Sequence, residues 1–266
     1  MRIVVCVKKV LDPDAVNNYA LAGNLNIGAD GKTLEVSAIP QLINGFDEQA
    51  MEAALRLRDA GADCRITAVS IGLDTKTLLR QCAALGADEI VAIDVDPVTL
   101  DSQVTANILS AYTRSSGGAD LVLCGRQASD DDQGVVPALI GETLGMPVVP
   151  LARAVELSGA SLRVIRATPD GDEIVEGVTP AVVTVSNELG DPRFPSAKAK
   201  MAARKMALVS ISVADLDLSG DQLAPRIILK KQYVPEVHGN CEFIDGTPAE
   251  AARVLVEKLR SGSIIR

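Results

Sequence analysis

One loop of the sequence has residue types and a position that suit anion binding. It spans residues 125–134, directly after an apolar run and directly before a segment with helical periodicity. Ligands of open α/β sheets bind where strands end and helices begin. A small, polar turn at that place exposes backbone amides, and the helix dipole favours a phosphate there. The loop is therefore predicted to be either a phosphate-binding turn or an ordinary polar helix entry.

Three consecutive acids in this loop, Asp130 to Asp132, leave both interpretations open. As N-cap and first-turn residues, they would stabilise the following helix by about 1 kcal/mol. In a phosphate site they would repel the ligand unless they turned outward, so amides and hydroxyls are expected to make the contact. Either way, the next helix is predicted to begin at about Asp132.

The other reactive residues do not form a catalytic set. The sequence has neither a G-x-G-x-x-G motif after its first strand nor a P-loop, and it has no G-x-S-x-G elbow. Its single histidine lies in the segment His238-Gly239-Asn240-Cys241, which is too sparse for a zinc site, because such a site needs three or four ligands. The pair Gly117 and Gly118 precedes a strand, so it is predicted to end a helix and not to bind pyrophosphate. We therefore predict no metal site and no enzyme active site.

The elements around the loop predict an α/β fold, because short β-branched runs alternate with helical stretches. The predicted strands are Ile3 to Val7, Arg65 to Ser70, Glu89 to Ile93 and Asp120 to Cys124. The predicted helices are Asp47 to Ala60, Thr75 to Leu85, Leu100 to Ser115 and Asp132 to Leu144. This order predicts an open, mostly parallel sheet with helices on both faces.

In the second half of the chain, short predicted strands follow one another without helices between them. Short strands are predicted at Ala154 to Leu157, Leu162 to Ala167, Glu173 to Val178 and Ala181 to Val185, which form a β-rich extension of the same sheet. A short Lys/Ala-rich helix, a polar connection to Pro235 and a last helix from Pro248 to Leu259, with Thr247 as N-cap, should follow. We therefore divide the chain into an α/β domain at 1–190 and a C-terminal arm at 191–266. The arm either wraps its own domain or embraces another chain.

Composition narrows the class of protein. The formal net charge of −9 and the pI near 4.7 argue against nucleic acid as a partner. There is no Trp, with three Tyr and three Phe, so any bound ring should be held by aliphatic side chains and backbone. Five widely spaced cysteines, no secretory pattern and no long apolar run predict a cytoplasmic protein that does not insert into a membrane. The Gly- and Asn-rich segment 17–40 is predicted to be a surface hairpin.

Several motifs together resemble those of electron-transfer flavoprotein beta subunits. The loop G-R-Q-A-S-D-D-D at 125–132 looks like that family's G-[KR]-Q-[AS]-x-D-D-D. Further similar segments, in order, are V-K-K-V at 7–10, N-G-F-D-E at 44–48, A-V-S-I-G at 68–72, L-G-A-D at 85–88, Arg166 with Gly171 and Glu173, P-A-V-V-T at 180–184 and D-P-R-F at 191–194. The matches keep their order over roughly three quarters of the chain.

The resemblance implies an AMP site at the carboxyl ends of the strands. The matching positions are Cys6, Asn44, Gly45, Phe46, Asp47, Ile71, Gly125, Arg126, Gln127, Ala128, Ser129, Asp130, Asp131, Asp132, Gln133, Gly134, Val135 and Val136. It also implies that an alpha subunit holds most of the FAD, so the beta chain is an electron-carrier subunit and not an enzyme. A flavoprotein dehydrogenase would be the electron donor, and a quinone oxidoreductase or similar protein the acceptor.

Partner recognition is expected in the segment after the sheet. The positions that the resemblance assigns to it are Pro192, Arg193, Phe194, Ala197, Lys198 and Lys200. Ala197 stands where dehydrogenase-binding members have a Leu that anchors the partner. Residues 133–137 also depart from the family's usual continuation of the acidic loop. Two alternatives therefore stay open: a bifurcating type with a second FAD in place of AMP, and a stand-alone adenine-nucleotide-binding protein of the universal-stress type.

Overall fold

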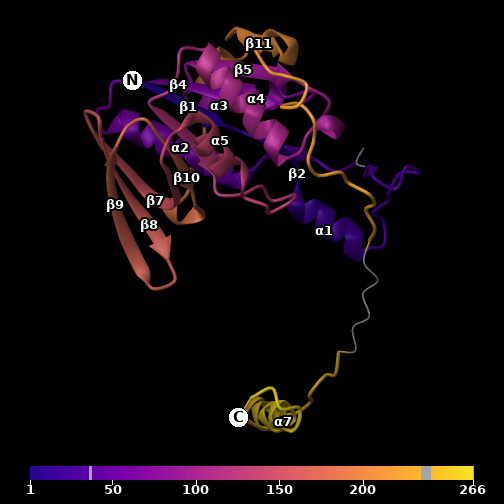
Figure 1. The fold of residues 1–266 in the computed structure, drawn as a ribbon. Helices are drawn as coiled ribbons and strands as arrows, with labels where there is room; N and C mark the ends of the chain where they lie inside the picture. Colours follow the sequence, from indigo (N-terminus) through magenta and orange to yellow (C-terminus); the bar gives the residue numbers. More distant parts are fainter. Residues whose placement is uncertain (36–37, 235–240, 266) are drawn as a thin grey trace. The chain divides into compact units, whose positions relative to one another are not determined.

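The computed structural model describes residues 1–35, 38–234 and 241–265, and a nine-stranded sheet is its main feature (Figure 1). The strand order is β11-β5-β4-β1-β6-β10-β7-β8-β9. All neighbours from β11 to β7 are parallel, and β8 is antiparallel to both β7 and β9. The predicted α/β class, with a mostly parallel sheet and a β-rich extension, is confirmed.

The inner parallel strands of the sheet are short apolar runs buried on both faces. The five inner ones are β1 (Arg2–Cys6), β4 (Arg65–Ile71), β5 (Glu89–Asp94), β6 (Leu121–Gly125) and β10 (Ala181–Val185). Alternate residues along each strand face opposite sides. Thus Ile3 and Val5 belong to one hydrophobic cluster and Val4 to the other.

Helices cover both faces of the sheet, as predicted. The first cluster contains residues of α2 (Gly45–Asp59) and α3 (Lys76–Leu85), and the second contains residues of α4 (Ser102–Ser115) and α5 (Val136–Leu144). The C-cap glycines Gly86 and Gly145 have φ values of 131° and 69°, which suits the predicted helix stops. A 3-10 turn, η1 (Pro97–Thr99), precedes α4.

The order of the strands reverses at β1. From β1 the chain adds β4 and β5 on one side, and it then crosses to β6 and β10 on the other. This reversal is a topological switch point, where crossover helices leave in opposite directions and a crevice opens at the strand ends. Cys6 and Gly125 end the two adjacent strands, so the loop at 125–134 begins at this crevice.

The β-rich extension continues the sheet beyond β10. It consists of β7 (Val148–Ser158), β8 (Ser161–Thr168) and β9 (Gly171–Val178). Arg166 and Glu173 lie opposite each other on β8 and β9 and form an ion pair near the turn at Pro169 and Asp170. The short turn η2 (Asn187–Leu189) follows β10.

Two local predictions were wrong. Helix α5 begins at Val136 and not at Asp132, because Asp132 and Gly134 have φ values of 51° and 63° and cannot continue a right-handed helix. Residues 208–212 form the edge strand β11 (Leu208–Ser212), parallel to β5, inside the expected polar connection. Its β-branched residues alternate with serines, a pattern that suits an edge strand.

The segment 17–40 contains the end of a helix as well as a short antiparallel pairing, whereas only a surface hairpin was expected. Its first residues belong to helix α1 (Pro13–Leu21), and a single antiparallel bridge joins Ile27 to Leu34. A separate two-stranded sheet, β2 (Lys9–Leu11) with β3 (Gln41–Ile43), flanks the segment on both sides. Residues 36 and 37 lie outside the described part of the chain.

The described chain divides into two compact units, Met1–Gln232 and Tyr233–Arg266. The first ends with α6 (Ala197–Ala203), β11 and the turn η3 (Val213–Asp215). The second contains α7 (Pro248–Ser261), and Thr247 caps this helix as predicted by accepting a hydrogen bond from the amide of Glu250. His238 lies outside the described residues. No described helix has the length and apolarity to span a membrane.

Candidate functional site

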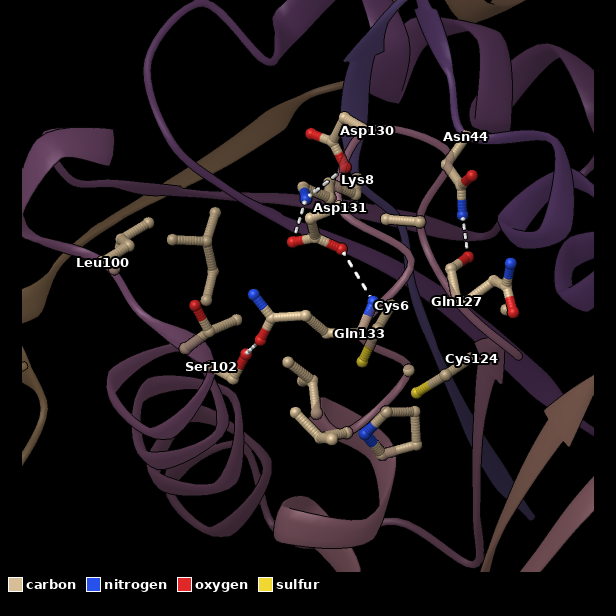
Figure 2. Close-up of a pocket in the computed structure, with 18 of the residues that line it drawn as sticks. Cys6, Lys8, Asn44, Leu100, Ser102, Cys124, Gln127, Asp130, Asp131 and Gln133 are labelled. Atoms are coloured by element: carbon tan, nitrogen blue, oxygen red, sulfur yellow. Dashed lines mark hydrogen bonds and ion pairs between the residues drawn. The ribbon is translucent and has the colours of Figure 1, made fainter. Parts of the chain in front are cut away.

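A cavity of about 520 Å³ opens at the switch point of the sheet (Figure 2). Its floor is formed by the ends of β1, β4 and β6, and its sides by the first residues of α4 and α5. Cavities of about 300 to 1,000 Å³ are typical of small-molecule sites. The geometry therefore provides room for a ligand at the place that the sequence predicts.

Most of the predicted cofactor-binding residues meet in this cavity. Those that line it are Cys6, Asn44, Asp47, Ile71, Gly125, Gln127, Ala128, Asp130, Asp131, Gln133, Gly134, Val135 and Val136. Five others do not line it. Gly45, Phe46 and Ser129 face a second hollow, Arg126 lies over the Phe46 ring at 5.2 Å from its centroid, and Asp132 accepts a hydrogen bond from Gln127.

The loop between β6 and α5 presents free amides to the cavity. Within the described part of the chain, the amides of Gly134, Val135 and Val136 donate to no protein acceptor. They lie at the start of α5, where the helix dipole adds a partial positive charge. No side chain caps this helix end. The arrangement offers several N–H donors to an anion.

Two of the three loop acids are held by Lys8. The Nζ atom of Lys8 lies 2.7 Å from Oδ1 of Asp130 and 3.2 Å from Oδ2 of Asp131, as Figure 2 shows. Burial lowers the pKa of Lys8, but the hydrogen bond and charge of Asp130, with those of Asp131, outweigh it and raise the pKa above its usual value. Part of the negative charge at the mouth of the cavity is thereby neutralised.

Asp47 ties the floor of the cavity together from inside. Its Oδ2 accepts a hydrogen bond from the amide of Lys8 at 2.7 Å, and its Oδ1 accepts one from the amide of Gly125 at 2.9 Å. Burial raises the pKa of Asp47 to about 7, although both hydrogen bonds act to lower it. A Cβ at Gly125 would lie 2.5 Å from the Asp47 carboxylate, so this contact requires glycine.

Asn44 fixes the start of the loop. Its Nδ2 donates to the carbonyl of Gln127 at 2.8 Å, and its Oδ1 accepts from the amide of Ser129 at 3.2 Å. Asn44 is also the N-cap residue of α2, but its side chain makes no capping hydrogen bond there. The side chain therefore positions the loop at 125–134 instead of closing its own helix.

Much of the remaining lining is aliphatic. Ile71, Leu100 and Leu109 contribute apolar surface, and no aromatic residue is among the residues that line the cavity. Figure 2 shows Leu100 and Ser102 on one side and Cys124 on the other. Cys6 and Cys124 are both free, and contact with the Cys6 thiol together with burial raises the pKa of Cys124. The buried Cys124 thiol adds to the apolar floor.

Sequence reasoning missed several of the lining residues. Lys8 lies two residues after the end of β1, and its position near a strand end could have indicated it. Ser102 and Thr105 come from the first turn of α4, and the hydroxyl of Ser102 donates to Gln133 at 2.8 Å. Pro97 and Leu100 precede that helix, and Ile227 and Leu229 come from the far end of the first unit. No local pattern marks the last pair.

The predicted partner-recognition residues form an exposed segment beside α2. Arg193 holds it by contacts of 2.8 Å to Oε2 of Glu52 and 2.6 Å to Asp59. Burial works against ionisation of Glu52, but hydrogen bonds from Arg193 and Arg56 hold the pKa of Glu52 below its usual value. Phe194 is 96% exposed, and Pro192 lines the second hollow. Ala197, Lys198 and Lys200 are exposed on α6.

These features define an open α/β protein with a ligand cavity at the topological switch point of its sheet. A family model described as "Electron transfer flavoprotein domain" matches residues 33–216. The chain belongs to the electron transfer flavoprotein beta-subunit family. It is 34% identical to the electron transfer flavoprotein subunit beta of Thermoanaerobacterium thermosaccharolyticum, with 100% of both chains covered.

Two further relatives have names that include a partner enzyme. The caffeyl-CoA reductase-Etf complex subunit CarD of Acetobacterium woodii is 32% identical to this chain. The acryloyl-CoA reductase electron transfer subunit gamma of Anaerotignum propionicum is 31% identical. In each case 100% of both chains is covered.

Proposed function

We propose that this beta subunit forms a heterodimer with an alpha subunit, binds AMP in the cavity at the switch point and supports the FAD that the alpha subunit mainly holds. FAD, when bound, supplies the electron-transfer chemistry, and the residues of this chain help to bind and orient the cofactors. The chain then acts as a carrier subunit in the cytoplasm, where its cysteines are expected to stay reduced. The absence of a predicted catalytic set supports this assignment.

The free amides at the start of α5 carry the AMP proposal. The donors of Gly134, Val135 and Val136 match a phosphate, which needs several hydrogen-bond donors and favours a helix N-terminus. Gly134 also has the φ of 63° and the close approach that such a cradle needs, because a Cβ there would lie 2.9 Å from the carbonyl of Arg126. The pairing of Asp130 and Asp131 with Lys8 reduces the repulsion that these acids would exert.

The aliphatic part of the cavity suits the adenosine moiety. An adenine ring can lie against Ile71 and Leu100 without an aromatic partner. FAD would add a second phosphate, a ribityl chain and a three-ring flavin to the same nucleotide, so it would need a much longer cavity. We therefore favour AMP over a second FAD.

The segment around Phe194 is proposed to meet a flavoprotein dehydrogenase. An exposed aromatic ring on a loop that Arg193 fixes to Glu52 is a suitable anchor for a partner. Exposed Lys198 and Lys200 would attract an acidic surface. The names of the two CoA-ester reductase relatives support a partner that acts on CoA thioesters. A quinone oxidoreductase or similar protein is the proposed acceptor.

Substitution of Ala197 tests how this loop contacts the donor. The Ala197→Leu variant adds an apolar side chain at an exposed position, and a well-filled pocket would gain about 1 to 3 kcal/mol. Reduction of the heterodimer by an acyl-CoA dehydrogenase should then saturate at a lower dehydrogenase concentration. Unchanged kinetics would show that the loop is not the contact.

Assembly with the alpha subunit is tested by gel filtration of the two chains after separate expression and mixing. We expect a single heterodimer peak that carries flavin absorbance. The exposed Leu255 on α7 is a candidate contact, since this helix has no buried side chain among its described residues. Leu255→Asp should weaken assembly, whereas Glu257→Ala on the same helix should not. Separate elution of the two chains after mixing would instead support a stand-alone nucleotide-binding protein.

A further inference from the structure

A segment far from the predicted site passes over the cavity. We call residues 226–232 the strap. Its Ile227 and Leu229 line the cavity, whereas Ile228 between them does not. Residues two apart in an extended chain point to the same side, which explains the alternation. Ile227 and Ile228 are similarly exposed, at 64% and 62%, so the difference between them is one of direction.

Asp101 holds the strap at its beginning. Its Oδ2 accepts hydrogen bonds from the amides of Arg226 and Ile227, the second at 2.9 Å. Its Oδ1 accepts one from the amide of Val104 at 2.8 Å, as the N-cap of α4. One carboxylate therefore joins the strap to the helix whose first turn forms a wall of the cavity.

Two further hydrogen bonds fix the strap and the chain before it. The Nδ2 of Asn107, one helical turn beyond Val104, donates to the carbonyl of Gln222 at 2.8 Å. At the other end, the amide of Gln232 donates to the carbonyl of Gly31 at 2.7 Å. The strap is thus tethered on both sides of the residues that line the cavity. Through the carbonyl of Gly31, the segment 17–40 helps to hold the strap in place.

We infer that Ile227 and Leu229 form the outer wall of the base subsite and contact the adenine ring of the bound nucleotide, with Asp101 as the residue that positions them. The inference rests on the proposed AMP function. The phosphate donors lie at the start of α5, so the base occupies the apolar part of the cavity, which Ile71 and Leu100 line together with the strap residues. Two aliphatic walls then enclose the ring in place of aromatic stacking.

The test of the base contact compares three serine variants of the full chain by calorimetric titration with AMP. Ile227→Ser and Leu229→Ser should each weaken AMP binding about tenfold, which corresponds to about 1.4 kcal/mol. Ile228→Ser is the matched control, because it removes the same side chain from a position that does not line the cavity, and it should bind like the wild-type chain. Equal affinities in all three variants would overturn the contact.

The role of Asp101 is tested by Asp101→Asn. Asparagine retains an oxygen that can cap α4 but cannot accept hydrogen bonds from two strap amides through its nitrogen. Hydrogen exchange at Arg226 and Ile227 should accelerate about tenfold, which corresponds to about 1.4 kcal/mol, while exchange within α4 stays unchanged. AMP should also dissociate faster. Unchanged exchange at both strap amides would overturn the positioning role.

The two tests also separate this inference from the proposed function. If the wild-type chain binds AMP but the strap variants behave like it, the strap inference fails and the AMP function stands. If the wild-type chain binds no AMP, the AMP function fails and the base contact fails with it. Exchange in the nucleotide-free chain then still decides whether Asp101 holds the strap.

Discussion

The side chain of Asp47 is joined to the backbone of Gly125 by a hydrogen bond of 2.9 Å inside the protein. The same carboxylate accepts the amide of Lys8 at 2.7 Å, so one residue of α2 connects the ends of β1 and β6. These two strands flank the point where the strand order reverses. The cavity therefore depends on a buried carboxylate that sequence reasoning assigned to nucleotide binding, but whose contacts in the structure are with its own chain.

Asp47→Ala should destabilise the protein. The substitution leaves the buried amide of Gly125 and the part-buried amide of Lys8 without this acceptor, and a buried unsatisfied donor costs about 1 to 3 kcal/mol. Urea unfolding would measure the loss against Asp217→Ala, which changes an exposed aspartate. Equal unfolding midpoints for the two variants would contradict the role of Asp47.

The stability of the protein should fall between about pH 4 and about pH 7 because of the same residue. Its pKa rises from 3.8 to about 7 on folding, so in this window the folded state retains a proton that the unfolded state has released. Raising the pH therefore favours unfolding until Asp47 is ionised in both states. Between about pH 5 and about pH 8, the free energy of unfolding should fall more for the wild-type chain than for Asp47→Asn, whose side chain at position 47 cannot titrate. An equal fall in both chains would contradict the raised pKa of Asp47.

Gly134→Ala should impair nucleotide binding. The new Cβ would lie 2.9 Å from the carbonyl of Arg126, in addition to the strain of a φ of 63°. Gly145→Ala is the matched control, because its φ is 69° and no atom lies within 4 Å of the added Cβ. Both variants should lose about 1 to 2 kcal/mol of stability from the left-handed conformation. Only Gly134→Ala should also weaken AMP binding, by about tenfold in a titration. Equal AMP affinities of the two variants would show that the loop does not contact the nucleotide.

Phe194→Ala should slow reduction by the donor without destabilising the chain. The ring is 96% exposed, so its removal should change the free energy of unfolding by less than about 0.5 kcal/mol. If the ring anchors the dehydrogenase, the donor concentration needed for half-maximal reduction should rise about tenfold. Leu21→Ala removes another exposed apolar side chain and serves as the control. Equal effects of the two substitutions would argue against a specific contact at Phe194.

The main elements were predictable because their signals are local. The apolar runs that became β1 and β6 are bounded by polar residues, and the glycines at 86 and 145 mark helix ends. The loop at 125–134 could be placed at the edge of the sheet because a strand precedes it and a helix follows it. Its match to a known family supplied the expected ligand.

The errors and omissions arise from contacts that no local pattern records. The acids at 130–132 look like the first turn of a helix, yet Asp130 and Asp131 turn to Lys8, more than a hundred residues away in sequence. The strap shows no periodicity, and its place over the cavity depends on Asp101, 125 and 126 residues before its two amides. Such pairings appear only after the chain has folded.

The nucleotide content of the purified heterodimer tests the central claim most directly. Acid release followed by mass identification and quantification would show which nucleotides the complex holds. One FAD and one AMP per heterodimer is the predicted result. Two FAD and no AMP would contradict the assignment of this cavity to AMP, and a complex without flavin would contradict the proposed role in electron transfer.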